Sequence, residues 1–292
     1  MNHRAGFVNI LGNPNVGKST IMNALVGEKL SIITAKAQTT RHRIMGIVNG
    51  EDFQIVYSDT PGILRPQYKL QETMMNFVNS ALSDADMILY VSDIGERSAY
   101  EGEYIDRITE SGIPVIIALN KVDLAEQAEL ERIVEAWHLA FPSSPVIPVS
   151  GLKKFNLDSL LAAILAKLPE SPPYFPKDQL TDKYERFFAS EIIREKILVN
   201  YKKEIPYSVE IEIESFKDEK EIIRIRALIH VARDSQKGII IGHKGSMLKR
   251  VGTEARRDME DFFRKKVFLE LYVKVTKDWR DKPTILKRFG YQ

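Results

Sequence analysis

The first half of the chain alternates short apolar runs with longer segments of helical length. The runs have the length of buried strands, and segments such as 127–141 and 156–168 lie between most of them. This alternation predicts an α/β fold in which helices cover both faces of a mostly parallel sheet, and ligands bind at the carboxyl ends of its strands. The expected strands are Phe7–Leu11, Ile44–Val48, Phe53–Tyr57, Met87–Val91, Val115–Leu119 and Val146–Val149.

The pattern changes after residues 169–176, which include four prolines. Proline cannot continue a helix, so this segment is expected to form an extended linker. Beyond it the pattern predicts the order helix, strand, strand, helix, helix, strand. These elements are expected over 183–200, 207–216, 221–231, the two sides of Gly242–Gly245, and 266–275. The expected parts are an α/β domain over 1–169, a Pro-rich linker over 170–180, and an α+β domain with a C-terminal tail over 181–292.

Charge is distributed unevenly along the chain, whose net charge is +2. Residues 1–170 contain 15 Lys and Arg against 20 Asp and Glu, whereas residues 171–292 contain 27 against 20. The basic excess in the second half favours a polyanionic partner there, although solvated charged surfaces are also common. The chain has no cysteine, which excludes disulfides and cysteine-bound zinc and fits a reducing cytoplasm. Neither a signal peptide nor a transmembrane helix is expected.

The segment Gly12–Ser19 matches the P-loop pattern G-x-x-x-x-G-K-[ST] between an expected strand and a helix. Its glycines let backbone N–H groups form a nest for phosphate, supported by the N-terminus of the helix. Lys18 is expected to reach the β- and γ-phosphates, and Ser19 to bind Mg²⁺. The alternative, a chance Gly-rich turn, is disfavoured by this position between strand and helix. The expected nucleotide contacts are Gly12, Asn13, Pro14, Asn15, Val16, Gly17, Lys18, Ser19 and Thr20.

Two further segments complete the expected phosphate site. Asp59-Thr60-Pro61-Gly62 follows the third expected strand, where its carboxylate can hold Mg²⁺ and its last N–H can contact the γ-phosphate. In the preceding loop, 35–43, we prefer Thr40 to Thr39 as the residue that coordinates Mg²⁺ while the γ-phosphate is present. An ordinary turn and a solvated basic loop are the alternative interpretations. The expected metal ligands are Ser19, Thr40 and Asp59, and the expected catalytic residues include Lys18, Thr40 and Gly62.

The segment Asn120-Lys121-Val122-Asp123 follows the fifth expected strand and indicates which base is bound. The Asp123 carboxylate can accept hydrogen bonds from guanine N1–H and the exocyclic amine, whereas adenine would leave it unpaired. We expect Asn120 to tie this loop to the P-loop and the stem of Lys121 to lie over the base. Ser150-Gly151-Leu152 follows the next strand and is placed to contact guanine O6 through backbone N–H groups. The motifs therefore predict GTP and GDP as ligands, and an ATPase is disfavoured.

Together these motifs resemble the translation-factor-related GTPases and, within them, the bacterial Era family. The resemblance rests on Gly12–Ser19, Gln38–Arg43, Asp59–Gly62 and Asn120–Asp123, and on a following domain that contains Gly242-His243-Lys244-Gly245. It spans essentially the whole chain. It implies hydrolysis of GTP to GDP and phosphate, with Mg²⁺ as cofactor.

Ile63 stands where many GTPases have a glutamine that orients the attacking water. Era-like GTPases share this apolar replacement. In related GTPases that depend on potassium, an asparagine at the position of Asn15 helps to hold K⁺, a cation that offsets the developing charge. The resemblance thus makes Asn15 a candidate catalytic residue and K⁺ ligand, with shaping of the loop as the alternative. We expect slow intrinsic turnover.

The segment Gly238–Gly245 ends in a G-x-x-G loop between two expected helices. Such a loop lets the chain approach a nucleic-acid backbone closely, as in KH modules, which hold about four nucleotides. The order of elements resembles the type II KH fold, and Lys244 would attract phosphate. Alone, two glycines three residues apart are a weak signal. The expected RNA contacts are Gly238, Ile239, Ile240, Ile241, Gly242, His243, Lys244, Gly245 and Lys249.

The Era resemblance implies a particular partner, the single-stranded 3′ end of small-subunit ribosomal RNA, during assembly of the 30S subunit. It also implies peripheral association with the inner membrane, while the protein is expected to be a cytoplasmic monomer. One alternative is an RNA-binding protein with a relic nucleotide site, which intact Lys18, Asp59 and Asp123 disfavour. Another is a membrane-associated signalling GTPase without an RNA role, which the KH-like domain disfavours.

Overall fold

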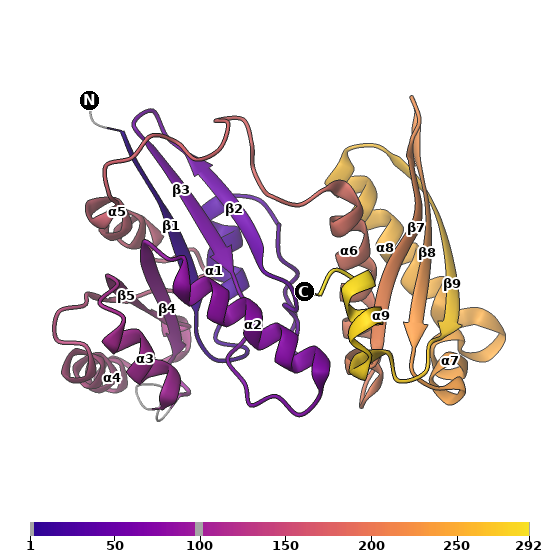
Figure 1. The fold of residues 1–292 in the computed structure, drawn as a ribbon, viewed down its shortest axis with the longest axis horizontal. Coiled ribbons are helices and arrows are strands. Elements are labelled where there is room, and N and C mark those ends of the chain that lie inside the picture. The colour runs from indigo at the N-terminus through magenta and orange to yellow at the C-terminus, as the bar shows by residue number, and fades with distance from the viewer. Residues whose placement is uncertain (1–2, 97–101, 292) are drawn as a thin grey trace. The chain divides into compact units, whose positions relative to one another are not determined.

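A six-stranded sheet with the order β2-β3-β1-β4-β5-β6 forms the centre of the N-terminal half in the computed structural model (Figure 1). Of the strands that the structure describes here, β2 is antiparallel to its neighbour, and the others are parallel. This mostly parallel sheet confirms the predicted α/β fold. The strands are β1 (Arg4–Leu11), β2 (Ile44–Asn49), β3 (Phe53–Asp59), β4 (Met87–Asp93), β5 (Val115–Asn120) and β6 (Val146–Pro148).

The central strands β4 and β5 are buried along nearly their whole length. Successive residues of a strand point to opposite faces of the sheet, so helices must cover both faces. The helices are α1 (Lys18–Val26), α2 (Lys69–Ser83), α3 (Glu103–Glu110), α4 (Gln127–Ala140) and α5 (Leu157–Lys167). Among the helices of the described chain, none combines the length and the apolar character needed to cross a bilayer.

The C-terminal half contains a second sheet with the order β7-β8-β9. β7 and β8 form an antiparallel hairpin, whereas β9 runs parallel to β8. Apolar side chains of the helices, such as Ile193 and Met259, share a core with strand residues such as Ile225. The chain order confirms the predicted helix–strand–strand–helix–helix–strand arrangement: α6 (Glu185–Asn200), β7 (Val209–Asp218), β8 (Ile222–Val231), α7 (Asp234–Ile241), α8 (Ser246–Phe263) and β9 (Lys266–Val275).

The chain after β9, expected only as a tail, packs on the second unit and forms a short helix, α9 (Pro283–Arg288). Trp279 is fully buried and donates from its indole nitrogen to the carbonyl oxygen of Ser208 at 3.1 Å. Near the end of the chain, the hydroxyl of Tyr291 donates to Glu210 at 2.7 Å. These contacts fix the C-terminal residues to the strand β7 region.

The structure describes residues 3–96 and 102–291, which divide into two units by their contacts. The first unit comprises residues 1–31, 40–65 and 74–182, and the second comprises 32–39, 66–73 and 183–292. The proline-rich segment contains no helix and belongs to the first unit. There Gln54 accepts hydrogen bonds from the N–H groups of Tyr174 and Phe175 at 2.7 and 2.9 Å.

Candidate functional site

The segment Gly12–Ser19 forms a tight loop between β1 and the first turn of α1. Gly12 and Gly17 have φ angles of 142° and 97°, which residues with side chains rarely adopt. A Cβ atom on Gly12 would lie 2.1 Å from the carbonyl oxygen of Val91, and one on Gly17 would lie 2.2 Å from the amide nitrogen of Asn120. The two glycines therefore keep the loop narrow at the start of α1, where the helix dipole favours phosphate.

Lys18 begins α1 and is almost completely buried. Its Nζ donates to the carbonyl oxygens of Gly12 and Asn13 at 2.9 and 2.8 Å. Burial lowers the pKa of Lys18 to about 8, although the charges of Asp59 and Glu96 oppose this shift. An anion in the loop would gain a Coulomb partner that is poorly screened by water.

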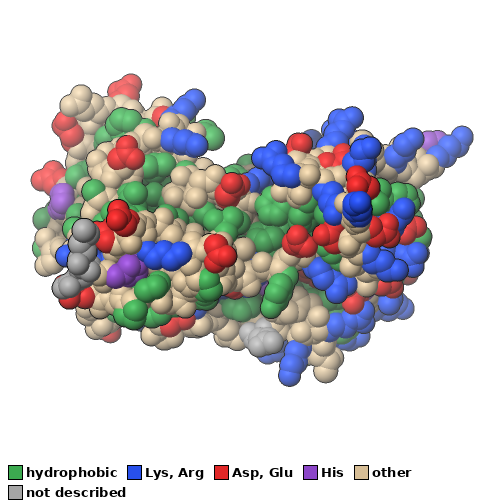
Figure 2. Space-filling model, turned by 90° about the horizontal axis from the view of Figure 1, so that it is seen from above, with side chains coloured by type: hydrophobic (Ala, Val, Ile, Leu, Met, Phe, Trp, Pro, Cys, Tyr) green, Lys and Arg blue, Asp and Glu red, His purple; other side chains and the backbone are tan. Residues whose placement is uncertain are grey.

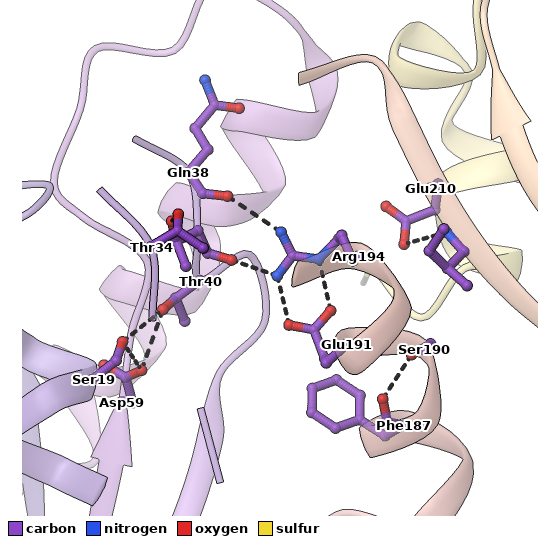
Figure 3. A network of polar contacts seen from close by, with 12 residues as sticks. Ser19, Thr34, Gln38, Thr40, Asp59, Phe187, Ser190, Glu191, Arg194 and Glu210 are labelled. Atoms are coloured by element: carbon purple, nitrogen blue, oxygen red, sulfur yellow. Dashed lines mark hydrogen bonds and ion pairs between the residues drawn. The ribbon is translucent and has the colours of Figure 1, made fainter. Parts of the chain in front are cut away.

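Ser19, Thr40 and Asp59, the three predicted metal ligands, meet at one point of the first unit (Figure 3). The hydroxyl of Ser19 donates to Asp59 Oδ2 at 2.6 Å and lies 2.9 Å from the hydroxyl of Thr40. The Thr40 hydroxyl lies 3.3 Å from the same carboxylate oxygen. The start of α1 and the end of β3 thus bring together Ser19 and Asp59, which are 40 positions apart in the chain, and the loop before β2 adds Thr40.

The oxygen atoms at this point fit a Mg²⁺ ion. Asp59 Oδ1 is buried and has no hydrogen-bond partner among the described residues. Burial raises the pKa of Asp59, and the Ser19 hydroxyl and the Lys18 ammonium oppose the increase. A dication would satisfy the free oxygen and keep the carboxylate ionised. Hydroxyl and carboxylate oxygens are the hard ligands that Mg²⁺ prefers.

The chain after Asp59 lies against the P-loop. The hydroxyl of Thr60 donates to the carbonyl oxygen of Ile10 at 2.7 Å, and the N–H of Ile63 donates to the carbonyl oxygen of Gly12 at 3.2 Å. Gly62 lies between these two anchors. The predicted contacts Thr60, Pro61 and Gly62 are therefore next to the loop that would hold the phosphates.

Asn120, at the end of β5, connects the two ends of the candidate nucleotide site. Its amide nitrogen donates to the carbonyl oxygen of Val16 at 2.8 Å, and its amide oxygen accepts the N–H of Gly151 at 2.9 Å. The predicted link to the P-loop is present, and the same side chain also holds the Ser150–Leu152 loop. Both hydrogen bonds are buried, which makes them costly to break.

Lys121 and Asp123, which follow Asn120 in the chain, differ in their contacts. The Nζ of Lys121 donates to the carbonyl oxygen of Asn15 at 2.8 Å and to Asp93 at 2.5 Å. Asp123 is exposed, and within the described part of the chain it forms no hydrogen bond or ion pair through its side chain. Its carboxylate is thus available to accept hydrogen bonds from a base. Leu152 is also exposed.

The remaining P-loop residues take varied positions. Asn15 is exposed and has a left-handed φ of 65°, and its side chain has no partner within residues 3–96 and 102–291. Val16 is buried beneath the loop, whereas Pro14 and Thr20 are half-buried. Asn13 donates from its side chain to Glu96 at 2.8 Å. Asn13 and Val16 therefore shape the loop through contacts with the protein.

Sequence reasoning missed two acidic residues at this site, Asp93 and Glu96. Asp93 pairs with Lys121, while Glu96 accepts hydrogen bonds from Asn13 and from the Ser92 hydroxyl. Asp93 is the last residue of β4 and Glu96 follows the strand, at the edge of the sheet where ligands are expected. Their position after an expected strand could have pointed to them, but neither residue belongs to a sequence motif.

In the second unit, Gly242 and Gly245 bracket a short turn between α7 and α8. His243 and Lys244 at the tip are exposed, as are Gly238 and Lys249 on the neighbouring helices. The predicted nucleic-acid loop is therefore accessible. The three isoleucines of α7 differ from the prediction that all contact RNA: Ile239 is exposed and Ile241 is half-buried, but Ile240 is fully buried in the core. Ile240 cannot contact a base without unpacking, because the helical period turns it inward.

Arg194 on α6 holds a segment that comes from the N-terminal half of the sequence but belongs to the second unit (Figure 3). Its guanidinium is fully buried, pairs with Glu191 at 2.5 Å, and donates to the backbone carbonyl oxygens of Gln38 and Thr39. Burial opposes the charge of Arg194, but Glu191 outweighs this effect and raises the pKa. Lys36 likewise donates to the carbonyl oxygens at the end of α6.

Basic side chains gather on the second unit, where Figure 2 shows more Lys and Arg than over the first. This agrees with the sequence, because residues 171–292 contain 27 Lys and Arg but only 20 Asp and Glu. Several of these cations have acidic neighbours, such as Arg250 with Glu254 and Arg256 with Glu260. Within residues 3–96 and 102–291, exposed Lys244 and Lys249 form no ion pair. The loop and the first turn of α8 are thus a more favourable place for phosphate than the paired arginines farther along α8.

Comparisons with known proteins support both halves of this description. A family model described as 50S ribosome-binding GTPase matches residues 7–121, and a KH domain model matches residues 204–280. GTPase Era from Syntrophus aciditrophicus is 46% identical over 291 residues, which cover 99% of this chain and 95% of that protein. The chain belongs to the Era family of GTPases. GTPase Era from Geotalea uraniireducens is 44% identical, with 99% and 98% of the two chains covered.

Two solved Era structures share the fold of the whole chain. A crystal structure of Era in complex with MgGDPNP and nucleotides 1506–1542 of 16S ribosomal RNA has a TM-score of 0.95 and 39% identity, and covers 99% of both chains. A variant of Aquifex aeolicus Era bound to GDP and AlF4⁻ has a TM-score of 0.94 and 38% identity, with the same coverage. These similarities confirm a P-loop GTPase domain followed by a KH domain.

Proposed function

We propose that this Era-family chain hydrolyses GTP, binds the single-stranded 3′ end of small-subunit ribosomal RNA, and acts in assembly of the 30S subunit. The observation that carries the proposal is the similarity over 99% of both chains to Era in complex with MgGDPNP and 16S ribosomal RNA nucleotides. The exposed G-x-x-G turn favours this function over a signalling GTPase without an RNA role. We place its action in the cytoplasm as a monomer; peripheral association with the inner membrane is a finer proposal, which vesicle flotation would test.

In the nucleotide site, the chain contributes mainly positioning and charge. The Lys18 ammonium and the N–H groups of the P-loop would offset the negative charge that develops on the phosphates during hydrolysis. Ser19, Thr40 and Asp59 would hold Mg²⁺, whose charge would help to neutralise the β- and γ-phosphates. Asp123 would select guanine through its free carboxylate.

Ile63 cannot orient a water molecule, so hydrolysis must rely on backbone groups and positive charge near the phosphates. The exposed side chain of Asn15 is our candidate ligand for K⁺, which would add such charge. With no glutamine at this position, intrinsic turnover should be slow. The nucleotide would then act mainly as a switch.

The experiment that tests the proposal is GTP turnover by the full-length protein in K⁺ or Na⁺, with and without a short RNA that matches the small-subunit 3′ end. We expect turnover of GTP but not ATP, with an increase when RNA is added. A dependence on K⁺ that is lost in Asn15→Ala would support the role of Asn15. GTP binding without any RNA binding would instead favour the signalling GTPase.

A further inference from the structure

An open groove of about 710 Å³ lies on the first unit, between α4 and the chain around β6. Leu130 and Val134 of α4 form one wall. On the other side, Pro148 is the last residue of β6, and Val122 and Phe155 come from the segments after β5 and β6. β6 is the outermost strand at this side of the described sheet. The groove therefore runs beside this edge of the sheet. None of its lining residues is a candidate nucleotide contact, and Val122 alone comes from the segment Asn120–Asp123.

The apolar surface at this groove is unusually accessible. The side chain of Phe155 is 57% exposed. Leu130 and Val134, on the same lining, are only partly buried. One exposed apolar side chain is ordinary in a soluble protein, but an exposed phenylalanine on the lining of a concave apolar surface indicates a binding site.

The wall formed by α4 is also acidic. Glu131 and Glu135 line the groove one helical turn apart, directly beside Leu130 and Val134, which have the same spacing. Within the part of the chain that the structure describes, neither carboxylate forms an ion pair. Across its whole length, α4 carries three glutamates and a single arginine. A ligand in the groove would therefore meet an apolar and an acidic stripe side by side.

We propose that this groove binds a segment of another protein that is rich in Lys and Arg and carries a large apolar anchor residue. The apolar stripe would take the anchor, and Glu131 and Glu135 would pair with the cations. RNA is a poor occupant, because its phosphates would lie next to two carboxylates. The inference rests on the proposed function: small-subunit proteins bind ribosomal RNA and therefore supply segments of this chemistry.

The test compares full-length variants of equal charge. Glu131→Lys/Glu135→Lys reverses the charge of the groove, whereas the matched control Glu126→Lys/Glu129→Lys makes the same change at exposed positions outside its lining. Phe155→Ala removes apolar surface without a change in charge. Each variant is titrated against intact 30S subunits, protein-free small-subunit RNA and a short oligonucleotide of the RNA 3′ end.

We expect both groove variants to bind 30S subunits at least about tenfold more weakly than the control, and to bind the two RNA probes as the control does. Equal affinity of all variants for 30S subunits would overturn the groove proposal. So would a matching loss on protein-free RNA, which would make RNA the occupant. If the unaltered chain binds neither RNA probe, the proposed function fails, and the 30S comparison still judges the groove separately.

Discussion

At the scale of single residues, Lys18 shows how a binding site sets the chemistry of its own side chains. The carbonyl oxygens of Gly12 and Asn13 hold the ammonium group, and burial lowers its pKa to about 8. Phosphates beside Lys18 would raise this pKa again, because they favour the charged form. Protonation of Lys18 and nucleotide binding are therefore linked: the free site loses its proton near pH 8, whereas the occupied site keeps it.

This linkage predicts that GDP affinity is nearly constant below about pH 8 and weakens above it, by up to tenfold per pH unit. The dissociation constant of a fluorescent GDP analogue, measured from about pH 7 to about pH 9, would show the slope. Lys18→Ala should bind weakly at every pH and lose the slope, which controls for titration of guanine itself. Equal slopes in the two proteins would contradict the assignment to Lys18.

The free carboxylate of Asp123 leads to a prediction about the base. Asp123→Asn replaces an acceptor with a group that also donates, so the preference should move from guanine toward xanthine, which has a carbonyl where guanine has an amine. We expect affinity for GTP to fall at least about 100-fold while affinity for XTP rises. Competition between the two nucleotides for the variant provides the measurement. A variant that still prefers GTP would disprove the proposed base pocket.

At the scale of elements, α6 depends on a buried ion pair. Arg194→Leu would leave Glu191 buried without its partner, which should cost about 3–5 kcal/mol of unfolding free energy. Glu191→Leu/Arg194→Leu should recover much of this loss, because it removes both charges. Urea unfolding followed by Trp279 fluorescence, in a Trp137→Phe background, would report on the second unit. A double variant as unstable as the single one would show that the carbonyl contacts of Arg194 matter more than its charge.

Elements with a strong local pattern were predictable from the sequence, and those that depend on distant contacts were not. β9 occupies the expected residues, 266–275, because its apolar positions alternate clearly. α9 was missed because it has six residues, too few to show a helical period, and it is held by packing around Trp279. The membership of residues 32–39 in the second unit has no local signal at all, since α6 creates it through Arg194 and Lys36.

The nucleotide motifs were similarly informative where chemistry requires one residue type. The structure brings Ser19, Thr40 and Asp59 together, although their roles remain predictions. Glu96 lay outside every motif, because a carboxylate that positions Asn13 could stand at several places in the loop after β4. Ile240 was misjudged because an apolar run near a binding loop does not reveal which side chains the helix turns inward.

At the scale of the whole molecule, the excess of basic residues after residue 170 predicts salt-sensitive RNA binding. A KH loop that holds about four nucleotides would neutralise a few phosphates, so the logarithm of the affinity should fall with the logarithm of salt concentration with a slope of about −2 to −3.

Lys244→Asp should weaken RNA binding strongly, reduce the slope of this salt dependence, and leave GTP binding unchanged. Fluorescence anisotropy with a short RNA at several salt concentrations would measure both quantities. Lys217→Asp, an exposed change of the same charge in the β7–β8 hairpin, is the control. Unchanged RNA affinity in Lys244→Asp would remove the KH loop from the proposal.

The double role of Asn120 has a consequence for how ligands are recognised. One amide holds Val16 in the P-loop and Gly151 in the base loop, so order in either loop is transmitted to the other. Binding of guanosine alone would order the base loop and, through Asn120, part of the P-loop, so that a phosphate ligand would lose less entropy on binding. Binding of pyrophosphate alone would lower the entropic cost of binding a base in the same way. The intact nucleotide should therefore bind more tightly than the separate affinities of its two halves suggest, and fragments of GTP should help one another to bind.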